Sequence, residues 1–336
     1  MKAAIIKEKG LLSVEEVPSP QAGAGDVVIK VRYCGICGSD VRLFHDGFYP
    51  VGLIMGHEFC GTISEVGYGV EGWAVGDRVT ATPAVMCGNC YYCLRGQRHH
   101  CRNIKIVGVD REMQGAFAEY VKVKADVLHR LPQEVSDEEA ANIEPCAVSL
   151  RAVRRSDIAI GDSAVIFGAG SIGLFALQCA RVAGARSVYV VEPAQGRASA
   201  GARLGADVVF DPEEPDIPAK VQQLTGAGAD IAYVCTASPP AFQQAAETVK
   251  RQGKVILVGG DGPAQVVPEF LMWKEVEVKG SYMYVDEFAL VIELFRQRKL
   301  KCEDMISEVI PLERMPEALK SLTKPTSEIK VLVQPG

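Results

Sequence analysis

The stretch SAVIFGAGSIGLFALQCARVAGA, residues 163–185, decides the fold of this chain. Residues 163–170 are typical of a buried strand that enters a glycine turn, and residues 171–185 have the small and apolar face of a packed helix. The turn holds Gly168, Gly170 and Gly173 in the spacing G-x-G-x-x-G. A strand, a glycine turn and a helix in this order predict one βαβ unit of a parallel sheet.

The same glycines predict a dinucleotide-binding site. Gly168 allows a tight turn, Gly170 lets a pyrophosphate approach the backbone, and Gly173 lets the helix pack on the strand. The backbone N–H groups at the start of the helix, including those of Ser171 and Ile172, face the phosphates. The motif alone is weak evidence because glycines recur in many turns, but here it follows a strand and opens a helix. A strand, turn and helix that bind nothing stay the alternative.

Two further residues bear on which dinucleotide binds. Glu192 ends the next strand, nineteen residues after Gly173. A carboxylate there accepts hydrogen bonds from the ribose hydroxyls of NAD and repels the extra phosphate of NADP. Arg197 lies five residues further on and either favours that phosphate or lies flat against the adenine. We expect NAD rather than NADP.

The alternation of strands and helices continues beyond this unit. It runs through SVYVVEP (187–193), RASAGARLGAD (197–207), VVF (208–210), DIAYVCTA (230–237), PAFQQAAETVKRQG (240–253), KVILVGG (254–260) and EVEVKGSYM (275–283). Such an alternation is typical of an α/β domain in which right-handed crossovers join the strands of a parallel sheet. We expect this dinucleotide-binding domain to span residues 150–284.

The first part of the chain, residues 1–149, is β-rich instead. Short strands with Gly and Pro between them are expected in DVVIKVRYCGIC (26–37), GTISEVG (61–67), GDRVTATP (76–83) and FAEYVKVKADVLHRLP (117–132). They predict a compact, partly closed β fold. In residues 285–336, DEFALVIELFRQRKL (286–300) predicts a helix and SEIKVLVQPG (327–336) a strand that returns to this first domain.

Bulk composition excludes several classes of function. A chain of 336 residues favours two domains, and its net charge of −6 gives no basic surface for nucleic acid or anionic lipid. The N-terminal residues contain no secretory apolar region, and no apolar run reaches the length of a membrane span. We therefore expect a cytoplasmic protein with no nucleic-acid or membrane partner. Eleven cysteines in a reducing cytosol favour metal ligands over disulfides.

Four of these cysteines lie within CGNCYYCLRGQRHHC (87–101). Cys87, Cys90, Cys93 and Cys101 have the spacing C-x2-C-x2-C-x7-C. Sulfurs spaced this closely can converge on one tetrahedral ion, and a four-cysteine cage is a closed, structural zinc site. Two disulfides would strain so short a loop. An iron–sulfur cluster and a redox sensor stay open as alternatives.

A second candidate metal site combines residues that are far apart in the sequence. Cys37 lies in the glycine-rich CGICGSD, His57 in GHEF and Glu144 in NIEPCAV. One Cys, one His and one carboxylate form a three-ligand zinc site that leaves room for water or substrate. Each residue alone has an ordinary explanation: a small buried residue, a core histidine and a charge at a helix start. A zinc site beside a dinucleotide fold explains all three together.

These motifs resemble the zinc-containing medium-chain alcohol dehydrogenases. GHEFCGTISEVGYGV (56–70) is similar to the zinc signature of that family, and the resemblance extends from Cys37 through the four-cysteine segment and the Glu-Pro pair at 144–145 to GAGSIG. It covers nearly the whole chain. It implies an α/β protein in which a split, GroES-like β-rich catalytic domain surrounds a Rossmann domain with a doubly wound parallel sheet. It also implies a homodimer or homotetramer.

Glu144 places the chain nearest the polyol and secondary-alcohol branch, which includes sorbitol, butanediol and threonine dehydrogenases. In ethanol-type relatives a cysteine stands at the corresponding place. The resemblance implies two zinc ions per chain, the catalytic one bound by Cys37, His57 and Glu144. It makes Glu58 an adjacent carboxylate that exchanges with water on the metal, and Cys146 a rival ligand.

The resemblance further implies that a secondary alcohol is oxidised to a ketone with NAD, and that Ser39 accepts the alcohol proton. Many relatives carry a relay histidine at the position of Arg42, and an arginine does not release protons near pH 7. Arg42 contacts an anionic group on a substrate, such as that of threonine or a polyol phosphate, or it is a surface residue paired with Asp40 or Asp46. Two other functions stay open: a non-enzymatic dinucleotide-binding protein, and a reductase of activated alkenes without catalytic zinc.

Overall fold

The computed structural model describes residues 1–260, 263–264, 266–324 and 326–336. Its contacts divide the chain into two compact units. The first unit contains residues 1–144, 288–296 and 306–336, and the second contains residues 145–287 and 297–305. The polypeptide therefore enters the second unit after Glu144, leaves it after Glu287, and returns to it once more over residues 297–305.

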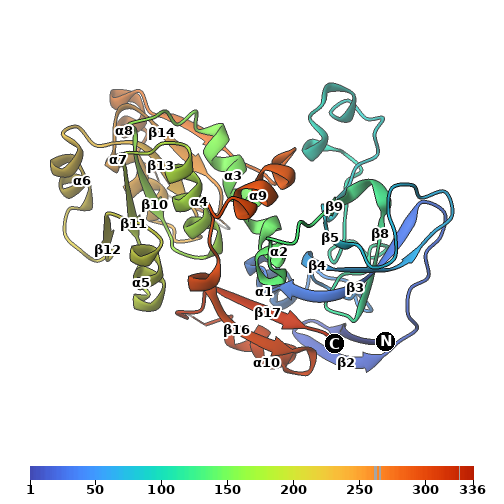
Figure 1. Cartoon of the computed structure of the whole chain (residues 1–336). Helices are drawn as coiled ribbons and strands as arrows, with labels where there is room; N and C mark the ends of the chain where they lie inside the picture. Colours follow the sequence, from blue (N-terminus) through green and yellow to red (C-terminus); the bar gives the residue numbers. More distant parts are fainter. Residues whose placement is uncertain (261–262, 265, 325) are drawn as a thin grey trace. The chain divides into compact units, whose positions relative to one another are not determined.

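The second unit is built on a six-stranded sheet with the order β12-β11-β10-β13-β14-β15. All five pairings are parallel (Figure 1). This is the strand order of a doubly wound dinucleotide-binding sheet, so the predicted Rossmann fold is confirmed. The strands are β10 (Ser163–Phe167), β11 (Ser187–Val191), β12 (Val208–Phe210), β13 (Ala229–Val234), β14 (Val249–Leu257) and β15 (Glu277–Gly280).

Helix α3 (Ile143–Arg155) precedes the first strand of this sheet, and five helices connect its strands. The sequence pattern predicts α4 (Ser171–Val182), α5 (Gln195–Arg203) and α7 (Ala241–Thr248) among them, but not α6 (Ile217–Thr225) or α8 (Pro268–Lys274). The predicted helix over 240–253 is too long, because Val249 already has extended backbone and begins β14. Gln252 in that strand has a positive φ of 58°, next to an irregularity in the pairing with β13.

The first unit is built on a seven-stranded sheet with the path β16-β17-β3-β4-β5-β9, and β8 pairs with β3 beside it. Its strands are β3 (Asp26–Gly35), β4 (Glu58–Val66), β5 (Arg78–Ala81), β8 (Tyr120–Lys124), β9 (Leu128–Arg130), β16 (Ile306–Pro311) and β17 (Lys330–Gln334). The C-terminal strand β17 pairs antiparallel with β3 through Leu332 and Val333. The predicted return of the chain end to this sheet is confirmed.

Several elements of the first unit lie where the sequence analysis placed none. They are the hairpin of β1 (Lys2–Glu8) and β2 (Leu11–Glu16), the pair β6 (Ala84–Val85) and β7 (Lys105–Ile106), strand β16, and helices α2 (Asp137–Ala141) and α10 (Met315–Ser321). Helix α1 (Gly38–Asp46) follows β3, and α9 (Glu287–Arg296) is the predicted helix near residue 290. Within the described part of the chain, no helix combines the length and apolar character needed to cross a membrane.

Candidate functional site

Cys37 lies at the point where strand β3 gives way to helix α1. It is the N-cap of that helix, and its Sγ accepts hydrogen bonds from the Ser39 backbone N–H at 3.4 Å and the Ser39 hydroxyl at 3.1 Å. A sulfur at a helix N-terminus is stabilised as a thiolate by the helix dipole and by unpaired N–H groups. This position therefore suits a metal-ligating thiolate.

The buried carboxylate of Asp40 links Cys37 to His57. Its Oδ2 accepts from the Cys37 backbone N–H at 3.2 Å, and its Oδ1 lies 3.5 Å from His57 Nδ1. The Tyr49 hydroxyl donates to the same Oδ1 at 3.1 Å. Burial opposes the charged imidazole, but Asp40 and Cys37 raise the pKa of His57 well above its ordinary value. The sequence analysis did not identify Asp40 and Tyr49 as site residues. Asp40 could have been found, because it is the third residue of a capping box that begins at Cys37.

Asp40 is 0% exposed and is therefore a residue of the interior. His57 is also buried, and its Nδ1 has no hydrogen bond of standard geometry within the described structure. The ligand atoms of Cys37, His57 and Glu58 all lie within 4.8 Å of one another. A buried imidazole, a thiol at a helix start and a carboxylate together form a donor set that fits zinc.

Glu58 is held by a lysine that the sequence analysis did not identify. Lys330 of β17 donates to Glu58 Oε2 at 2.5 Å and to the Ile36 carbonyl at 3.2 Å. Burial alone would lower the pKa of Lys330, but Glu58, Cys37 and Glu144 raise it above its ordinary value. A Cβ at Gly35 would overlap the Glu58 carboxylate and lie 3.3 Å from Lys330 Cδ, so this glycine makes room for the pair.

Glu144 and Cys146 differ in their surroundings. Glu144 lies outside the group of ligand atoms within 4.8 Å, but it belongs to the same unit and its charge acts on Lys330. Cys146 belongs to the second unit and is fully buried. Burial and the neighbouring thiols of Cys179 and Cys302 raise its pKa well above the ordinary value, which favours an inert thiol.

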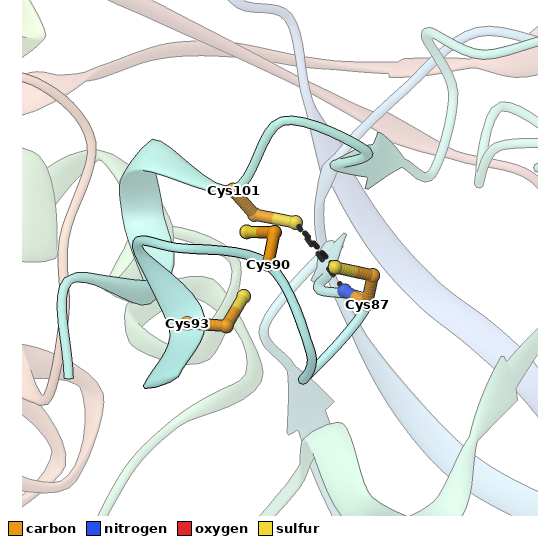
Figure 2. Close-up of side chains that lie close together, drawn as sticks. All are labelled: Cys87, Cys90, Cys93 and Cys101. Atoms are coloured by element: carbon orange, nitrogen blue, oxygen red, sulfur yellow. Dashed lines mark hydrogen bonds between the residues drawn. The ribbon is translucent and has the colours of Figure 1, made fainter. Parts of the chain in front are cut away.

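The second metal candidate is the segment around the four closely spaced cysteines. The sulfurs of Cys87, Cys90, Cys93 and Cys101 lie within 4.8 Å of one another and point toward a common centre (Figure 2). The Cys101 thiol donates to the Cys87 sulfur at 3.4 Å. Two short 3-10 turns, Cys93–Arg95 and Arg98–His100, bring the last two cysteines back toward the first two.

The backbone around this group already donates hydrogen bonds to sulfur. The N–H of Cys87 lies 3.3 Å and that of Asn103 3.4 Å from Cys101 Sγ. Backbone N–H groups of Cys93 and Arg102 lower the pKa of Cys90 to about 6, whereas burial and the neighbouring thiols raise that of Cys93 to about 12. Such N–H groups stabilise thiolates, and a four-thiolate cage leaves no position open for a substrate. All eleven cysteines are free of disulfides.

The glycine turn between β10 and α4 has the geometry that the motif predicts. Gly168 has a φ of 95°, and a Cβ at Gly173 would overlap the Gly168 carbonyl oxygen, so this close helix–strand contact requires a glycine. A Cβ at Gly170 would meet no atom within 4 Å. The N–H groups of Ile172 and Gly173 have no hydrogen-bond acceptor among the described residues. This open space and these donors fit a phosphate group.

Glu192 lies at the carboxyl end of β11, beside that turn. Its two carboxylate oxygens accept from the N–H groups of Ala169 at 2.7 Å and Ala194 at 3.0 Å, and the residue is 6% exposed. Glu192, Arg197 and Gly168 line one cavity of about 200 Å³. The predicted dinucleotide residues therefore converge within the second unit.

Comparison with known proteins decides the family. Residues 23–133 match the alcohol dehydrogenase GroES-like domain, and residues 171–297 match the zinc-binding dehydrogenase domain. The (R,R)-butanediol dehydrogenase of Bacillus subtilis (strain 168) is 34% identical over all of both chains. A sorbitol dehydrogenase of Halalkalibacterium halodurans is also 34% identical, over 100% of this chain and 99% of its own.

The chain belongs to the zinc-containing medium-chain alcohol dehydrogenase family. The crystal structure of a zinc-binding dehydrogenase from Sinorhizobium meliloti 1021 bound to NADP superposes with a TM-score of 0.94, at 31% identity over 99% of both chains. Family membership confirms the predicted fold class, a GroES-like domain with a Rossmann domain, and the predicted enzyme class, an alcohol dehydrogenase.

Proposed function

We propose that this dehydrogenase transfers a hydride between a secondary alcohol of the diol, polyol or sugar-alcohol type and NAD, giving the ketone. The observation that carries the proposal is the convergence of Cys37, His57 and Glu58, with ligand atoms within 4.8 Å, in a member of a zinc-dependent family. The butanediol and sorbitol dehydrogenases among its relatives support this substrate class.

The two sets of candidate metal ligands have different roles in this proposal. Cys37, His57 and Glu144 hold a catalytic zinc, and Cys87, Cys90, Cys93 and Cys101 hold a structural one. When bound, the catalytic zinc supplies a Lewis acid that lowers the pKa of a hydroxyl group. Glu58, oriented by Lys330, is the exchangeable carboxylate of the site.

Asp40 orients the proposed ligands through hydrogen bonds and charge. It binds the Cys37 backbone and faces His57, and such a carboxylate fixes the orientation of a ligating imidazole. The Ser39 hydroxyl, which now donates to Cys37 Sγ at 3.1 Å, is free to rotate and accept the alcohol proton. It begins the proton relay.

In the second unit, Gly168, Gly170 and Gly173, with the N–H groups of Ser171 and Ile172, bind the pyrophosphate. The dinucleotide supplies the hydride acceptor. Glu192 receives the ribose hydroxyls and Arg197 borders the adenine, which favours NAD over NADP. Replacing Glu192 by alanine should weaken binding of NAD more than that of NADP, as measured by titration of both reduced forms.

An assembly of two or four copies in the cytoplasm completes the proposal. Several large apolar side chains at one edge of the second unit are exposed: Phe270, Met272, Trp273, Val278 and Tyr282. The neighbouring strand β15 pairs only with β14 within the described structure. Apolar contact area beside an open strand edge is typical of an interface with a second copy.

A second substrate class follows from Arg42. This arginine is exposed on α1, three residues after Ser39, and its charge acts on the hydroxyl of Tyr49. It could bind a carboxylate or phosphate group. Threonine or a polyol phosphate would then be the substrate.

The deciding experiment measures initial rates of NAD reduction at mildly alkaline pH, with metal content determined on the same preparation. The panel contains butanediol, sorbitol, other polyols, threonine, polyol phosphates and primary alcohols. Turnover of neutral diols or polyols with two zinc ions per chain supports the main proposal, and a preference for threonine or phosphates supports the role of Arg42. NADH binding without turnover contradicts both and favours a non-enzymatic protein, and a single zinc per chain favours an alkene reductase.

A further inference from the structure

Strand β8 of the first unit has one paired edge and one open edge. Its residues pair with β3, and the N–H of Val31 and that of Ala125 bond to the carbonyls of Glu119 at 2.9 Å and Gly25 at 3.0 Å. In an antiparallel ladder, hydrogen-bonded pairs alternate with pairs whose backbone groups point away from the partner. The N–H and C=O groups of Tyr120, Lys122 and Lys124 therefore point away from β3, and none of them is hydrogen-bonded to another described residue.

These open backbone groups border a cavity. It has a volume of about 590 Å³, within the range of ligand-binding pockets, and all five residues of β8 line it. Apolar side chains form much of the remaining wall, among them Ile5, Val17, Pro18, Ile54 and Met113. Val121 and Val123 are 2% exposed and belong to the same apolar face. The open edge of β8 therefore borders an apolar groove.

The other face of β8 carries Lys122 and Lys124. Lys124 pairs with Asp26 at 2.5 Å, whereas Lys122 and the nearby Lys30 of β3 have no carboxylate partner among the described residues. A second copy of β8 is a poor occupant, because antiparallel pairing about Lys122 would place the two copies of Lys122 opposite each other. An acidic strand would meet opposite charges instead.

We propose that this groove binds an extended acidic peptide segment of a partner protein, which adds to β8 as a further strand. Backbone groups of Tyr120, Lys122 and Lys124 would hold the segment, as in other complexes formed by strand addition. Its residues opposite Lys122 are acidic, and its alternate residues, on the face of Val121, are apolar. This interaction is independent of the proposed oxidoreduction and uses none of its residues.

The test uses the full chain and two capped synthetic peptides, Glu-Val-Glu-Val-Glu and Lys-Val-Lys-Val-Lys. Calorimetric titration should show binding of the acidic peptide only. Hydrogen exchange at the amides of Tyr120, Lys122 and Lys124 should be fast in the free protein and slow with the peptide. An acidic peptide with methylated backbone nitrogens should not bind, a result that does not depend on any change to the protein.

Replacement of Lys122 by proline is the sharpest variant. Compared with Lys122→Ala, it removes only the outward N–H, since the ladder to β3 uses Val121 and Val123, and proline is tolerated at such edge positions. We expect a loss of about five- to tenfold beyond that of Lys122→Ala, the size of one net backbone hydrogen bond. Thermal melting checks that both variants fold.

Equal peptide affinity of the Lys122→Pro and Lys122→Ala variants would overturn the proposal. Slow hydrogen exchange at the amides of residues 120, 122 and 124 in a peptide-free oligomer would also overturn it, because a second copy of the chain would then cover the edge. If neither peptide bound, the proposal would be wrong, and the lysines of β8 would serve only to prevent edge-to-edge strand pairing.

Discussion

The Lys330 ammonium lies 2.5 Å from the Glu58 carboxylate, although 272 residues separate the two in the sequence. Both side chains are 2% exposed. Taking two charges out of water is costly, and their mutual attraction at this short distance offsets part of that cost. This pair links the last strand, β17, to strand β4 at the point where Glu58 follows the proposed ligand His57.

Replacing Lys330 by methionine should therefore destabilise the first unit strongly. The change leaves a buried carboxylate unpaired, and we expect a loss of about 3–5 kcal/mol in the free energy of unfolding, measured with urea. The double variant Lys330→Met with Glu58→Gln removes both charges and should recover much of the loss. A double variant no more stable than Lys330→Met would show that packing, not the ion pair, accounts for the loss.

Tyr49 should affect the metal site without touching the metal. Its hydroxyl donates to Asp40 Oδ1, the oxygen nearest His57. In the Tyr49→Phe variant this buried carboxylate loses one donor, and we expect a cost of about 1.5–3 kcal/mol in the free energy of unfolding. Zinc should also dissociate faster into a chelator, because Asp40 no longer holds the imidazole in one orientation.

The matched control is Tyr68→Phe, which removes a hydroxyl from a residue that is 90% exposed. It should change neither stability nor zinc release. If Tyr49→Phe behaved like this control, the contact with Asp40 would have no influence on the ligands.

Two glycines of the same turn should respond to alanine in opposite ways. At Gly170 a Cβ meets no protein atom within 4 Å, so Gly170→Ala should melt like the native chain and lose NADH binding, since the methyl group fills the space for the pyrophosphate. At Gly173 a Cβ overlaps the Gly168 carbonyl, so Gly173→Ala should destabilise the second unit itself.

Gly280→Ala, another position with no atom within 4 Å, is the control and should keep both stability and NADH binding. Fluorescence titration with NADH and thermal melting distinguish these outcomes. Native NADH affinity in Gly170→Ala would remove this turn from phosphate recognition.

Local patterns in the sequence were sufficient for the parallel sheet of the second unit. The glycine motif and the alternation of strands and helices predicted a parallel sheet, because each depends on residues close together in the chain. The end of the helix before β14 was placed too late, since Val249 and the following residues join the sheet through tertiary pairing with β13. Local propensity contains no information about that pairing.

The residues that surround the proposed zinc ligands come from parts of the chain that are far apart in the sequence. Cys37, His57 and the four close cysteines were found because their residue types and spacing are unusual. Lys330 was not found, because a single lysine in the strand KVLVQ gives no sign that it will be buried against Glu58. Asp40 was considered only as one possible partner of a surface Arg42, although it is the third residue of a capping box that begins at Cys37.

The four-cysteine segment should bind its zinc independently of the first metal group. We expect two zinc ions per chain by elemental analysis, and one in a Cys90→Ser variant, because a closed tetrahedral cage needs all four thiolates. The backbone N–H groups that lower the pKa of Cys90 to about 6 remain, but a serine hydroxyl does not ionise near pH 7. Segment 87–101 should then become sensitive to proteases.

The control is Cys60→Ser, at a buried cysteine outside both metal groups whose thiol donates to the Asp137 carbonyl at 3.1 Å. A serine can make the same bond, so two zinc ions should remain. Two zinc ions in Cys90→Ser would contradict the cage. One zinc ion in the native chain, retained by Cys90→Ser, would place the metal at Cys37 and His57 alone and favour a disulfide or redox role for the four cysteines.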